Sequence, residues 1–200
     1  MILAILVAVF AVAAFFSAAG NALLIRALRV YNVLDIPNQR SAHRVPTPRG
    51  GGVGLLLGGA VGLKLGDLAG LPLPPAPILW TTAAVAVVGL LDDLFSSLSA
   101  LFRFAAQIAS AVSLVLLVGP IPRFPLPPPL DFDLGPLAIP VTILWLVALT
   151  NIFNFLDGMD GYAGSQALLA AAGVVLFWPG RLGLTGAALA GACVGFLWFN

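Results

Sequence analysis

Residues able to do chemistry gather in three short polar segments, which are separated by long apolar runs. The first segment, residues 35–52, contains the only histidine, His43, with Arg44, Thr47 and Arg49 ahead of three consecutive glycines. Glycines that open a helix expose backbone N–H groups to an anion, and arginines add charge-assisted hydrogen bonds. The segment therefore favours phosphate binding. The alternative is a basic loop that only fixes membrane topology and touches anionic lipid.

The second segment is the acidic pair Asp92-Asp93, at the end of another apolar run. Adjacent carboxylates repel one another and lose solvation at a membrane interface, so they usually have a counter-ion. Mg²⁺ or a polarised phosphate would fill that role. The alternative is that the two acids only cap loop donors or offset nearby arginines.

The third segment carries Asn151, Asn154, Asp157 and Asp160, at every third position, where a further apolar run ends. This spacing places neighbouring members on roughly one face of a helix. Acids at a helix C-terminus oppose the helix dipole, so simple capping chemistry is disfavoured. The pattern predicts a ligand site, with Gly161 suited to a helix end or to close approach of the backbone to a ligand.

The composition requires a membrane setting for these segments. Apolar residues make up 60% of the 200 positions and charged residues only 8%, against roughly 25% charged in soluble domains. This excludes a soluble globular enzyme, a disordered chain and a nucleic-acid partner bound through basic patches. The single cysteine, Cys193, excludes an intrachain disulfide framework and a multi-cysteine metal site.

The apolar runs predict an all-α, polytopic transmembrane helix bundle that forms one integral membrane domain over residues 1–200. A spanning helix needs about 20 mostly apolar residues. We expect seven spans in the lipid bilayer: Ile2–Ile25, Gly50–Leu65, Ile78–Leu91, Leu101–Gly119, Leu137–Phe155, Ser165–Trp178 and Leu182–Phe199. Glycines in the second span are expected to let helices approach closely, namely Gly50, Gly51, Gly52, Gly54, Gly58 and Gly59.

The distribution of basic residues predicts the orientation, because cytoplasmic loops carry an excess of Lys and Arg. Six lie on one side, Arg26, Arg29, Arg40, Arg44, Arg49 and Arg103, against three on the other, Lys64, Arg123 and Arg181. The N-terminus is therefore expected outside. All three polar segments then lie on the cytoplasmic face of the inner (plasma) membrane.

Taken together, the motifs resemble those of the polyprenyl-phosphate N-acetylhexosamine-1-phosphate transferases, which include the undecaprenyl-phosphate GlcNAc-1-phosphate transferases and the phospho-MurNAc-pentapeptide transferase. Three elements match in order and spacing: His43 with Pro46-Thr47-Pro48-Arg49-Gly50-Gly51; Leu91-Asp92-Asp93 followed by Arg103 and Gln107; and Asn151, Asn154-Phe155, Asp157-Gly158 and Asp160-Gly161. The form of the first and third elements resembles the GlcNAc and O-antigen-initiating branch more than the peptidoglycan branch.

The resemblance implies a reaction, its partners and residue roles. A polyprenyl (undecaprenyl) phosphate attacks the β-phosphorus of a UDP-N-acetylhexosamine, with Mg²⁺ as cofactor, and starts cell-wall or surface-polysaccharide synthesis. A homodimer is also expected. Asp92 would orient or deprotonate the lipid phosphate, with Asp93 supporting it. Asn154 and Asp157 would contact the nucleotide or Mg²⁺, with Asn151 and Asp160 as second choices. The residues expected to hold the diphosphate are His43, Arg44, Thr47 and Arg49.

Family members continue beyond the position equivalent to Asn200 into a Phe-Met-Gly-Asp segment and a basic, His-containing loop. The chain is therefore expected to be the N-terminal portion of a longer family fold, without the aspartate that the family uses most directly for Mg²⁺. An inactive remnant, a scaffold, and a transporter or channel fragment remain as alternatives. A transport pathway predicts polar groups near mid-span, whereas here they cluster at the span ends.

Overall fold

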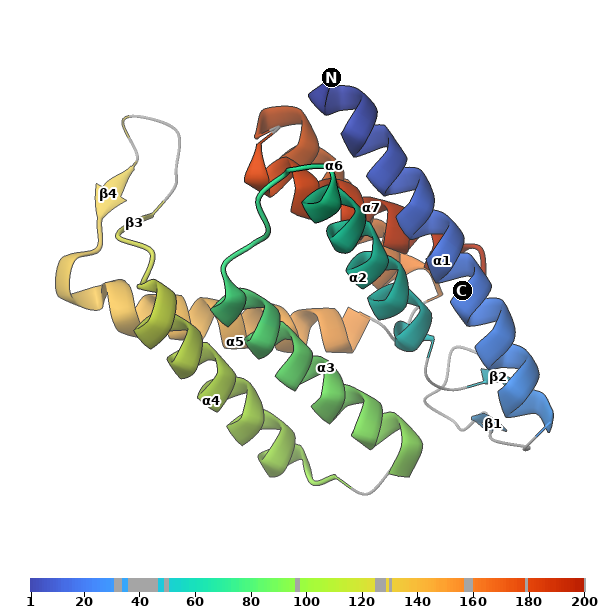
Figure 1. Cartoon of the computed structure of the whole chain (residues 1–200). Helices are drawn as coiled ribbons and strands as arrows, with labels where there is room; N and C mark the ends of the chain where they lie inside the picture. The colour runs from blue at the N-terminus through green and yellow to red at the C-terminus, as the bar shows by residue number, and fades with distance from the viewer. Residues whose placement is uncertain are drawn as a thin grey trace. The chain divides into compact units, whose positions relative to one another are not determined.

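The computed structural model describes residues 1–30, 34–35, 47–48, 51–95, 98–124, 129, 131–156, 160–178 and 180–199, of which 34–35, 47–48, 94–95 and 181 are described by their backbone alone. In these ranges lie the seven α-helices α1 (Ile2–Val30), α2 (Gly52–Leu68), α3 (Ala76–Phe95), α4 (Ala100–Val118), α5 (Ala138–Leu156), α6 (Tyr162–Phe177) and α7 (Arg181–Leu197) (Figure 1). Each of the seven apolar runs expected from the sequence overlaps one of these helices, so the all-α prediction is confirmed.

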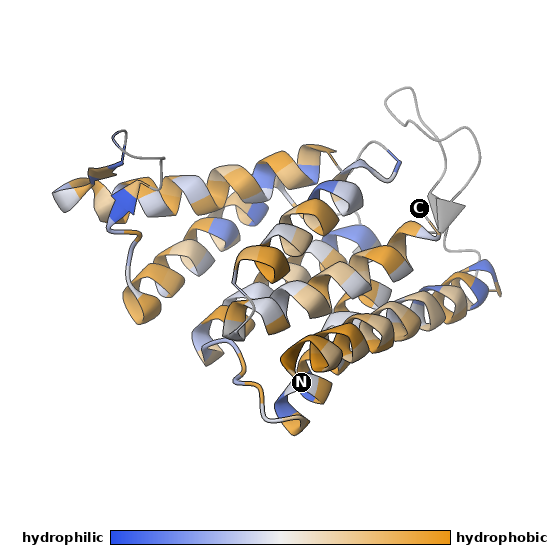
Figure 2. Ribbon diagram, turned by 90° about the horizontal axis from the view of Figure 1, so that it is seen from above, coloured by the Kyte–Doolittle hydropathy of each residue, from blue (hydrophilic) through white to orange (hydrophobic). Residues whose placement is uncertain are grey.

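Among the residues that the structure describes, four helical segments are long and apolar enough to cross a membrane: Ile2–Val30, Ala76–Asp93, Ala100–Val118 and Gly135–Leu156. The helices α6 and α7 are apolar but shorter, and α2 has 17 residues. Hydrophobic residues make up most of the helical ribbon, and many of the hydrophilic ones lie towards helix ends and connections (Figure 2). The fold is thus that of a membrane helix bundle, while the spanning role of the three shorter helices stays a prediction.

Two compact units divide the chain. Unit 1 contains residues 1–74 and 155–200, and unit 2 contains residues 75–154. Each unit is described by itself below. The expected single membrane domain over residues 1–200 stays a prediction.

Unit 1 is held together by close helix contacts at a glycine stripe on α2. Gly54, Gly58, Gly62 and Gly66 are the buried residues of this helix, one per turn. A Cβ atom on Gly58 would lie 2.4 Å from the backbone oxygen of Ala13 in α1. On Gly66 it would lie within van der Waals overlap of the Leu184 side chain in α7. Glycine is therefore required here because the neighbouring helices occupy the space of a side chain.

The sequence prediction of this contact face was only partly right. Gly51, Gly54 and Gly58 make the expected close approach, whereas a Cβ on Gly52 or Gly59 would meet no heavy atom within 4 Å among the described residues. Gly50 lies outside the residues that the structure describes. Gly62 and Gly66 had not been predicted. The face follows the four-residue repeat of a helix side and not the consecutive glycines at the helix start.

The directions of the helices in unit 1 follow from paired contacts. Leu6 and Leu184 belong to one hydrophobic cluster, and further along both helices Ser17 Oγ donates to the backbone oxygen of Ala192 at 2.7 Å. The helices α1 and α7 thus run parallel. The helix α2 runs antiparallel to both, because Gly66 approaches Leu184 while Gly51 approaches Phe196.

Unit 2 is built on the helical hairpin of α3 and α4. Ser99 caps α4 by accepting a hydrogen bond from Phe102 N at 3.2 Å. The helix α4 ends at Gly119, whose φ of 102° is in the left-handed region. The helix α5 runs antiparallel to α4, since Ile121 N donates to Thr142 Oγ1 at 2.9 Å near the start of α5.

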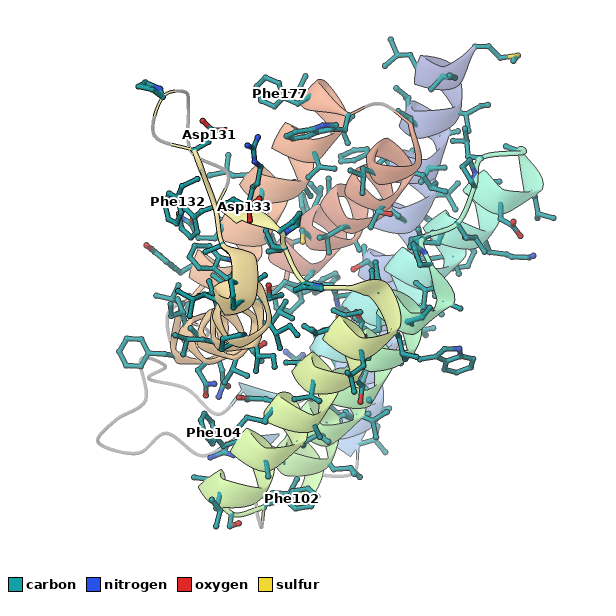
Figure 3. The ribbon with its side chains drawn as sticks, turned by 90° about the vertical axis from the view of Figure 1, so that its left-hand side faces the viewer. Phe102, Phe104, Asp131, Phe132, Asp133 and Phe177 are labelled. Atoms are coloured by element: carbon teal, nitrogen blue, oxygen red, sulfur yellow. The ribbon has the colours of Figure 1, made fainter. Side chains whose placement is uncertain are left out.

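A short hairpin connects α4 to α5 and contains β3 (Arg123–Phe124) and β4 (Phe132–Asp133), followed by the 3₁₀ turn Gly135–Leu137. The Phe124 ring stacks on Phe132 with centroids 5.6 Å apart and meets Trp145 edge-on at 5.9 Å. In unit 2 this hairpin lies at the opposite end of α4 from Phe102 (Figure 3). The other strands, β1 (Leu34–Asp35) and β2 (Thr47–Pro48), form an antiparallel pair in unit 1.

Candidate functional site

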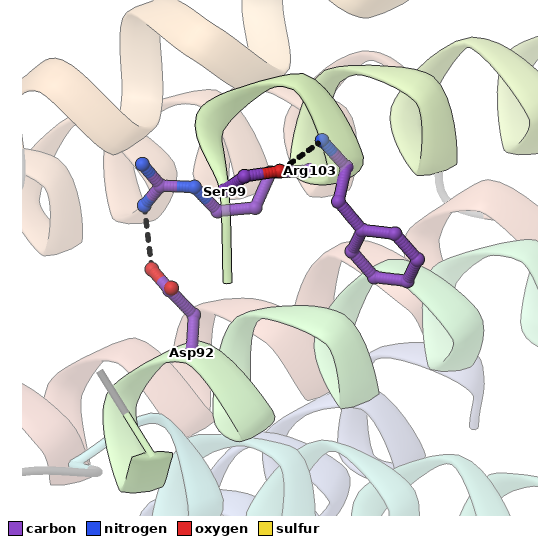
Figure 4. A network of polar contacts seen from close by, with 4 residues as sticks. Asp92, Ser99 and Arg103 are labelled. Atoms are coloured by element: carbon purple, nitrogen blue, oxygen red, sulfur yellow. Dashed lines mark hydrogen bonds and ion pairs between the residues drawn. The ribbon is translucent and has the colours of Figure 1, made fainter. Parts of the chain in front are cut away.

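An ion pair joins the end of α3 to the first turns of α4. Arg103 Nη1 lies 2.5 Å from Asp92 Oδ2 (Figure 4). The carboxylate side chain is 22% exposed and the guanidinium side chain 36% exposed, so both remain accessible from solvent. The Ser99 cap fixes where α4 begins and thereby places Arg103 one turn into the helix, opposite Asp92. The predicted acidic site therefore has a positively charged partner within unit 2.

A second polar contact lies one helical turn further along α4. Asn151 Nδ2 donates to Gln107 Oε1 at 2.6 Å and to the backbone oxygen of Val147 at 2.8 Å. Because Arg103 and Gln107 are four residues apart, they lie on one face of α4. This face contacts α3 through Arg103 and α5 through Gln107. Two of the three predicted polar segments are thus brought to the same end of unit 2.

The other predicted residues of unit 2 lie beside these contacts. Asp93 follows Asp92 at the end of α3 and is exposed, and Asn154 is exposed three residues after Asn151. A guanidinium has five N–H donors, so its contact with Asp92 is compatible with a second contact from Arg103 to a phosphate oxygen. Carboxylate, carboxamide and guanidinium groups therefore face solvent together at this end.

A groove of about 340 Å³ runs between α3, α4 and α5 within unit 2. Its lining is mostly apolar, with Val85, Leu114 and Leu146 among the contributors. Gln107 also lines it. Since Gln107 binds Asn151, the groove adjoins the polar contacts described above. The mostly apolar groove thus lies next to the helix end that carries the charged side chains.

In unit 1 the end of the first polar segment and the start of α6, which follows the third segment, lie at the same end of the helices. The Phe196 ring of α7 lies between two glycines: a Cβ would lie 3.0 Å from it on Gly51 and 3.3 Å from it on Gly164. These glycines are at the starts of α2 and α6. Both N-cap residues, Gly51 and Gly161, are glycines and have no side chain that could cap these helix starts. The backbone N–H groups of an uncapped helix start favour an anion.

Asp160 requires a correction to the expected helical series. The helix α5 ends at Leu156, and Asp160 occupies an exposed turn just before α6. It therefore does not share a helical face with Asn151. The reason is local: Gly161 adopts a φ of 68°, in the left-handed region, and begins a new helix. At this position the carboxylate of Asp160 is favoured by the positive end of the α6 dipole.

Four predicted site residues, His43, Arg44, Arg49 and Asp157, lie outside the residues that the structure describes. Thr47 is described by its backbone alone, which pairs with Asp35 in the β1–β2 pair. The roles expected for these five residues stay predictions.

From the sequence, Arg103 was counted towards the membrane orientation and was placed with Gln107 in a motif, but neither residue was given a role in the site. The spacing of these two residues could have indicated that they have polar partners. A cation and an amide, four residues apart, interrupt an otherwise apolar run, and polar residues within a span are costly unless they have a partner.

Comparison with known proteins adds a family match. The family model described as glycosyl transferase family 4 matches residues 76–200. The chain is 28% identical over 172 residues to a probable undecaprenyl-phosphate N-acetylglucosaminyl 1-phosphate transferase of Bacillus subtilis, covering 84% of this chain and 48% of that protein. It is 30% identical over 191 residues to the decaprenyl-phosphate N-acetylglucosaminephosphotransferase of Mycobacterium leprae, covering 82% of this chain and 46% of that protein.

A more distant match is the phospho-N-acetylmuramoyl-pentapeptide-transferase of Pelodictyon phaeoclathratiforme, 26% identical over 161 residues, which covers 62% of this chain and 42% of that protein. The chain spans about half the length of the Bacillus subtilis and Mycobacterium leprae relatives. No solved structure matches it.

Proposed function

The chain belongs to glycosyl transferase family 4, and from that premise we propose that it transfers an N-acetylhexosamine-1-phosphate from a UDP-sugar to a polyprenyl phosphate. The names of its relatives give the general reaction and a polyprenyl phosphate acceptor. The observation that carries the proposal is the Asp92–Arg103 ion pair next to the Gln107–Asn151 contact, beside an apolar groove. The proposed setting is the cytoplasmic face of the inner (plasma) membrane.

The proposed reaction is a phosphoryl transfer that balances without a redox partner. An oxygen of the lipid phosphate forms a bond to the β-phosphorus of the UDP-sugar. The bond from that phosphorus to the bridging oxygen breaks, and its electron pair leaves with UMP. The products are the lipid-diphospho-sugar and UMP. Such transfers depend mainly on positioning and on neutralising charge at the phosphate oxygens.

Arg103 and Asp92 supply those two requirements in unit 2. A phosphate monoester is mostly dianionic at neutral pH, so removing its last proton adds little. The main task proposed for Asp92 is therefore to orient Arg103, whose guanidinium binds the lipid phosphate. Asp93 supports this arrangement. A carboxylate–guanidinium–phosphate chain also avoids placing two anions in direct contact.

Mg²⁺ is the proposed cofactor. Within the described ranges no group of three His, Cys, Asp or Glu residues could hold a metal ion. A site with one carboxylate and one carboxamide still suits Mg²⁺, because the ion commonly uses one or two protein oxygens together with substrate phosphates and waters. Asn154, with Asp157, would hold it. When bound, Mg²⁺ would neutralise charge on the diphosphate.

The groove of unit 2 is the proposed place for the first part of the prenyl chain. Its apolar lining suits an isoprenoid, and Gln107 marks the end at which the phosphate would lie. The chemistry of the lining thus matches an acceptor with a charged head and an apolar tail.

The donor is proposed to bind through the predicted residues at the end of unit 1. The uncapped start of α2 suits a diphosphate, with His43, Arg44, Thr47 and Arg49 in the segment before it. Asp160, in the turn before α6, would contact the nucleotide or Mg²⁺. The homodimer suggested by the resemblance stays a prediction.

Exchange of labelled UMP into UDP-GlcNAc tests the proposed function. Membranes that carry the chain should catalyse this exchange when both Mg²⁺ and a polyprenyl phosphate are present. Absence of exchange under these conditions would instead favour an inactive chain or a scaffold. Passage of substrate across sealed vesicles without exchange would favour a transporter.

A further inference from the structure

Asn21 is a buried carboxamide whose polar atoms have no hydrogen-bond partner in the described part of the chain. It lies in α1 and is 2% exposed. Neither Nδ2 nor Oδ1 has a partner among the residues that the structure describes. One turn earlier on the same buried stripe, Ser17 is 0% exposed but donates its hydroxyl hydrogen to Ala192 O. Burying a polar group without a hydrogen bond costs free energy. The burial of Asn21 without a partner therefore indicates a hydrogen-bonding ligand for its side-chain amide.

The carboxamide is directed at the start of α2. A Cβ on Gly54 would lie 2.5–2.6 Å from Cγ, Oδ1 and Nδ2 of Asn21, so the amide lies flat against the first turn of that helix. The Oδ1 atom is 4.0 Å from the Cβ position of Gly51, the N-cap residue. The helices α1 and α2 lie side by side along this contact (Figure 1).

The chemistry around Asn21 favours an anion with several oxygens. The first turn of α2 has no side-chain cap among the described residues, and its N–H groups carry the positive end of the helix dipole. Further along α1, Arg26 and Arg29 are exposed and add positive charge. A phosphate oxygen can accept both from first-turn N–H groups and from Asn21 Nδ2, as phosphates do at helix starts.

We propose that Asn21 is a phosphate-binding residue, which donates through Nδ2 to a phosphate oxygen held at the N-terminus of α2. This inference rests on the proposed function and deepens it by naming a contact that the three polar motifs do not include. The phosphate belongs either to a nucleoside diphosphate or to a lipid phosphate. Both have the same chemistry at this position.

The full 200-residue chain in nanodiscs, labelled with ¹⁵N, allows a direct test. The side-chain amide resonance of Asn21 is assigned by its absence from Asn21→Leu. Inorganic pyrophosphate, UDP and farnesyl phosphate are then titrated separately. We expect the Asn21 amide resonance to shift with pyrophosphate, and Asn21→Leu to bind it at least ten-fold more weakly.

The two sources give different patterns in the remaining titrations. A ten-fold loss confined to UDP assigns the phosphate to the nucleotide, and a loss confined to farnesyl phosphate assigns it to the lipid. Either pattern supports the proposal. Asn21→Asp should lose affinity as well, because a carboxylate is close to the amide in shape but has no donor and repels the anion.

Ser17→Ala is the matched control, since Ser17 is equally buried on the same face of α1. It should lower the melting temperature through loss of its bond to Ala192 and leave all three affinities unchanged. Asn21→Leu removes an unpaired polar group and is expected to keep or raise the melting temperature. Loss of affinity without loss of stability separates phosphate binding from a packing role.

Wild-type affinity of Asn21→Leu for all three probes overturns the proposal, as does an Asn21 resonance that no probe shifts. If UMP exchange persists in either case, the proposed function stands and only the role of Asn21 is wrong. If the wild-type chain binds none of the probes and catalyses no exchange, both are wrong. Pyrophosphate binding through Asn21 without exchange supports the phosphate site alone.

Discussion

Asn151 in α5 donates a hydrogen bond to Gln107 in α4 across 2.6 Å, and 44 residues of chain separate them. The contact fixes which turn of α5 faces the start of α4. It also places Asn154 near the helix end that carries Asp92 and Arg103. Two side-chain amides thus set the position of a predicted substrate-binding segment relative to a predicted catalytic one.

Replacing Gln107 or Asn151 by Leu is expected to reveal this coupling. Each single variant leaves one amide without its partner, and the double variant removes both. Polar contacts between membrane helices couple by about 0.6 kcal/mol on average, so a coupling of that order is expected. A double-mutant cycle on unfolding in detergent measures it. Strictly additive effects would show that the amides act independently.

Replacing Arg103 by Ala is expected to lower Mg²⁺-dependent turnover about a hundred-fold, and replacing Asp92 by Asn should lower it by a similar factor. The reason is that each removes a group that positions or neutralises the lipid phosphate, and loss of one such donor typically costs about 10²–10³ in rate. Initial rates of lipid-diphospho-sugar formation measure the effect.

Lys64→Ala provides the control for these charge changes. Lys64 also forms an ion pair, with Asp67 at 2.7 Å, but on the exposed surface of α2. Exposed pairs contribute little to stability. Its turnover should match that of the wild-type chain, and near-normal turnover of Asp92→Asn would contradict the role given to that aspartate.

The sequence predicted much of the fold because apolar runs and helix breakers are local signals. All seven helices follow from them. The series that ends in Asp160 could not be predicted correctly from spacing, since α5 ends at Leu156 and Asp160 lies in the turn before α6. Spacing alone does not reveal where a helix stops.

Side-chain partners were harder to predict than helices. The Asp92 motif was visible in the sequence, but its contact with Arg103 depends on the turn between α3 and α4 and on where Ser99 starts the second helix. Asn21 gave a weaker signal, as a single amide in a long apolar run. Its significance appears only when the burial of the side chain and its missing partners are known.

Replacing Gly58 by Ala is expected to destabilise unit 1. The added methyl group would lie 2.4 Å from Ala13 O and 2.7 Å from Ser17 Cβ, so α1 and α2 must separate. Overpacking of this kind typically costs about 1–3 kcal/mol. Thermal unfolding in detergent should show a lower melting temperature. Gly59→Ala, next to it but without close neighbours in the described chain, should be neutral or stabilising because alanine favours helix.

Replacing Val85 by Trp is expected to obstruct the groove of unit 2 and to raise the KM for a polyprenyl phosphate. Val85 lines the groove, and the indole would occupy part of its volume of about 340 Å³. A farnesyl phosphate acceptor, whose chain is shorter, should be affected less than an undecaprenyl phosphate. The KM for the UDP-sugar should stay unchanged, because that substrate does not enter the groove. Val87→Trp is the control, since Val87 is 53% exposed and is not among the groove-lining residues. An equal rise in KM for both lipids, or in both variants, would place the prenyl chain elsewhere.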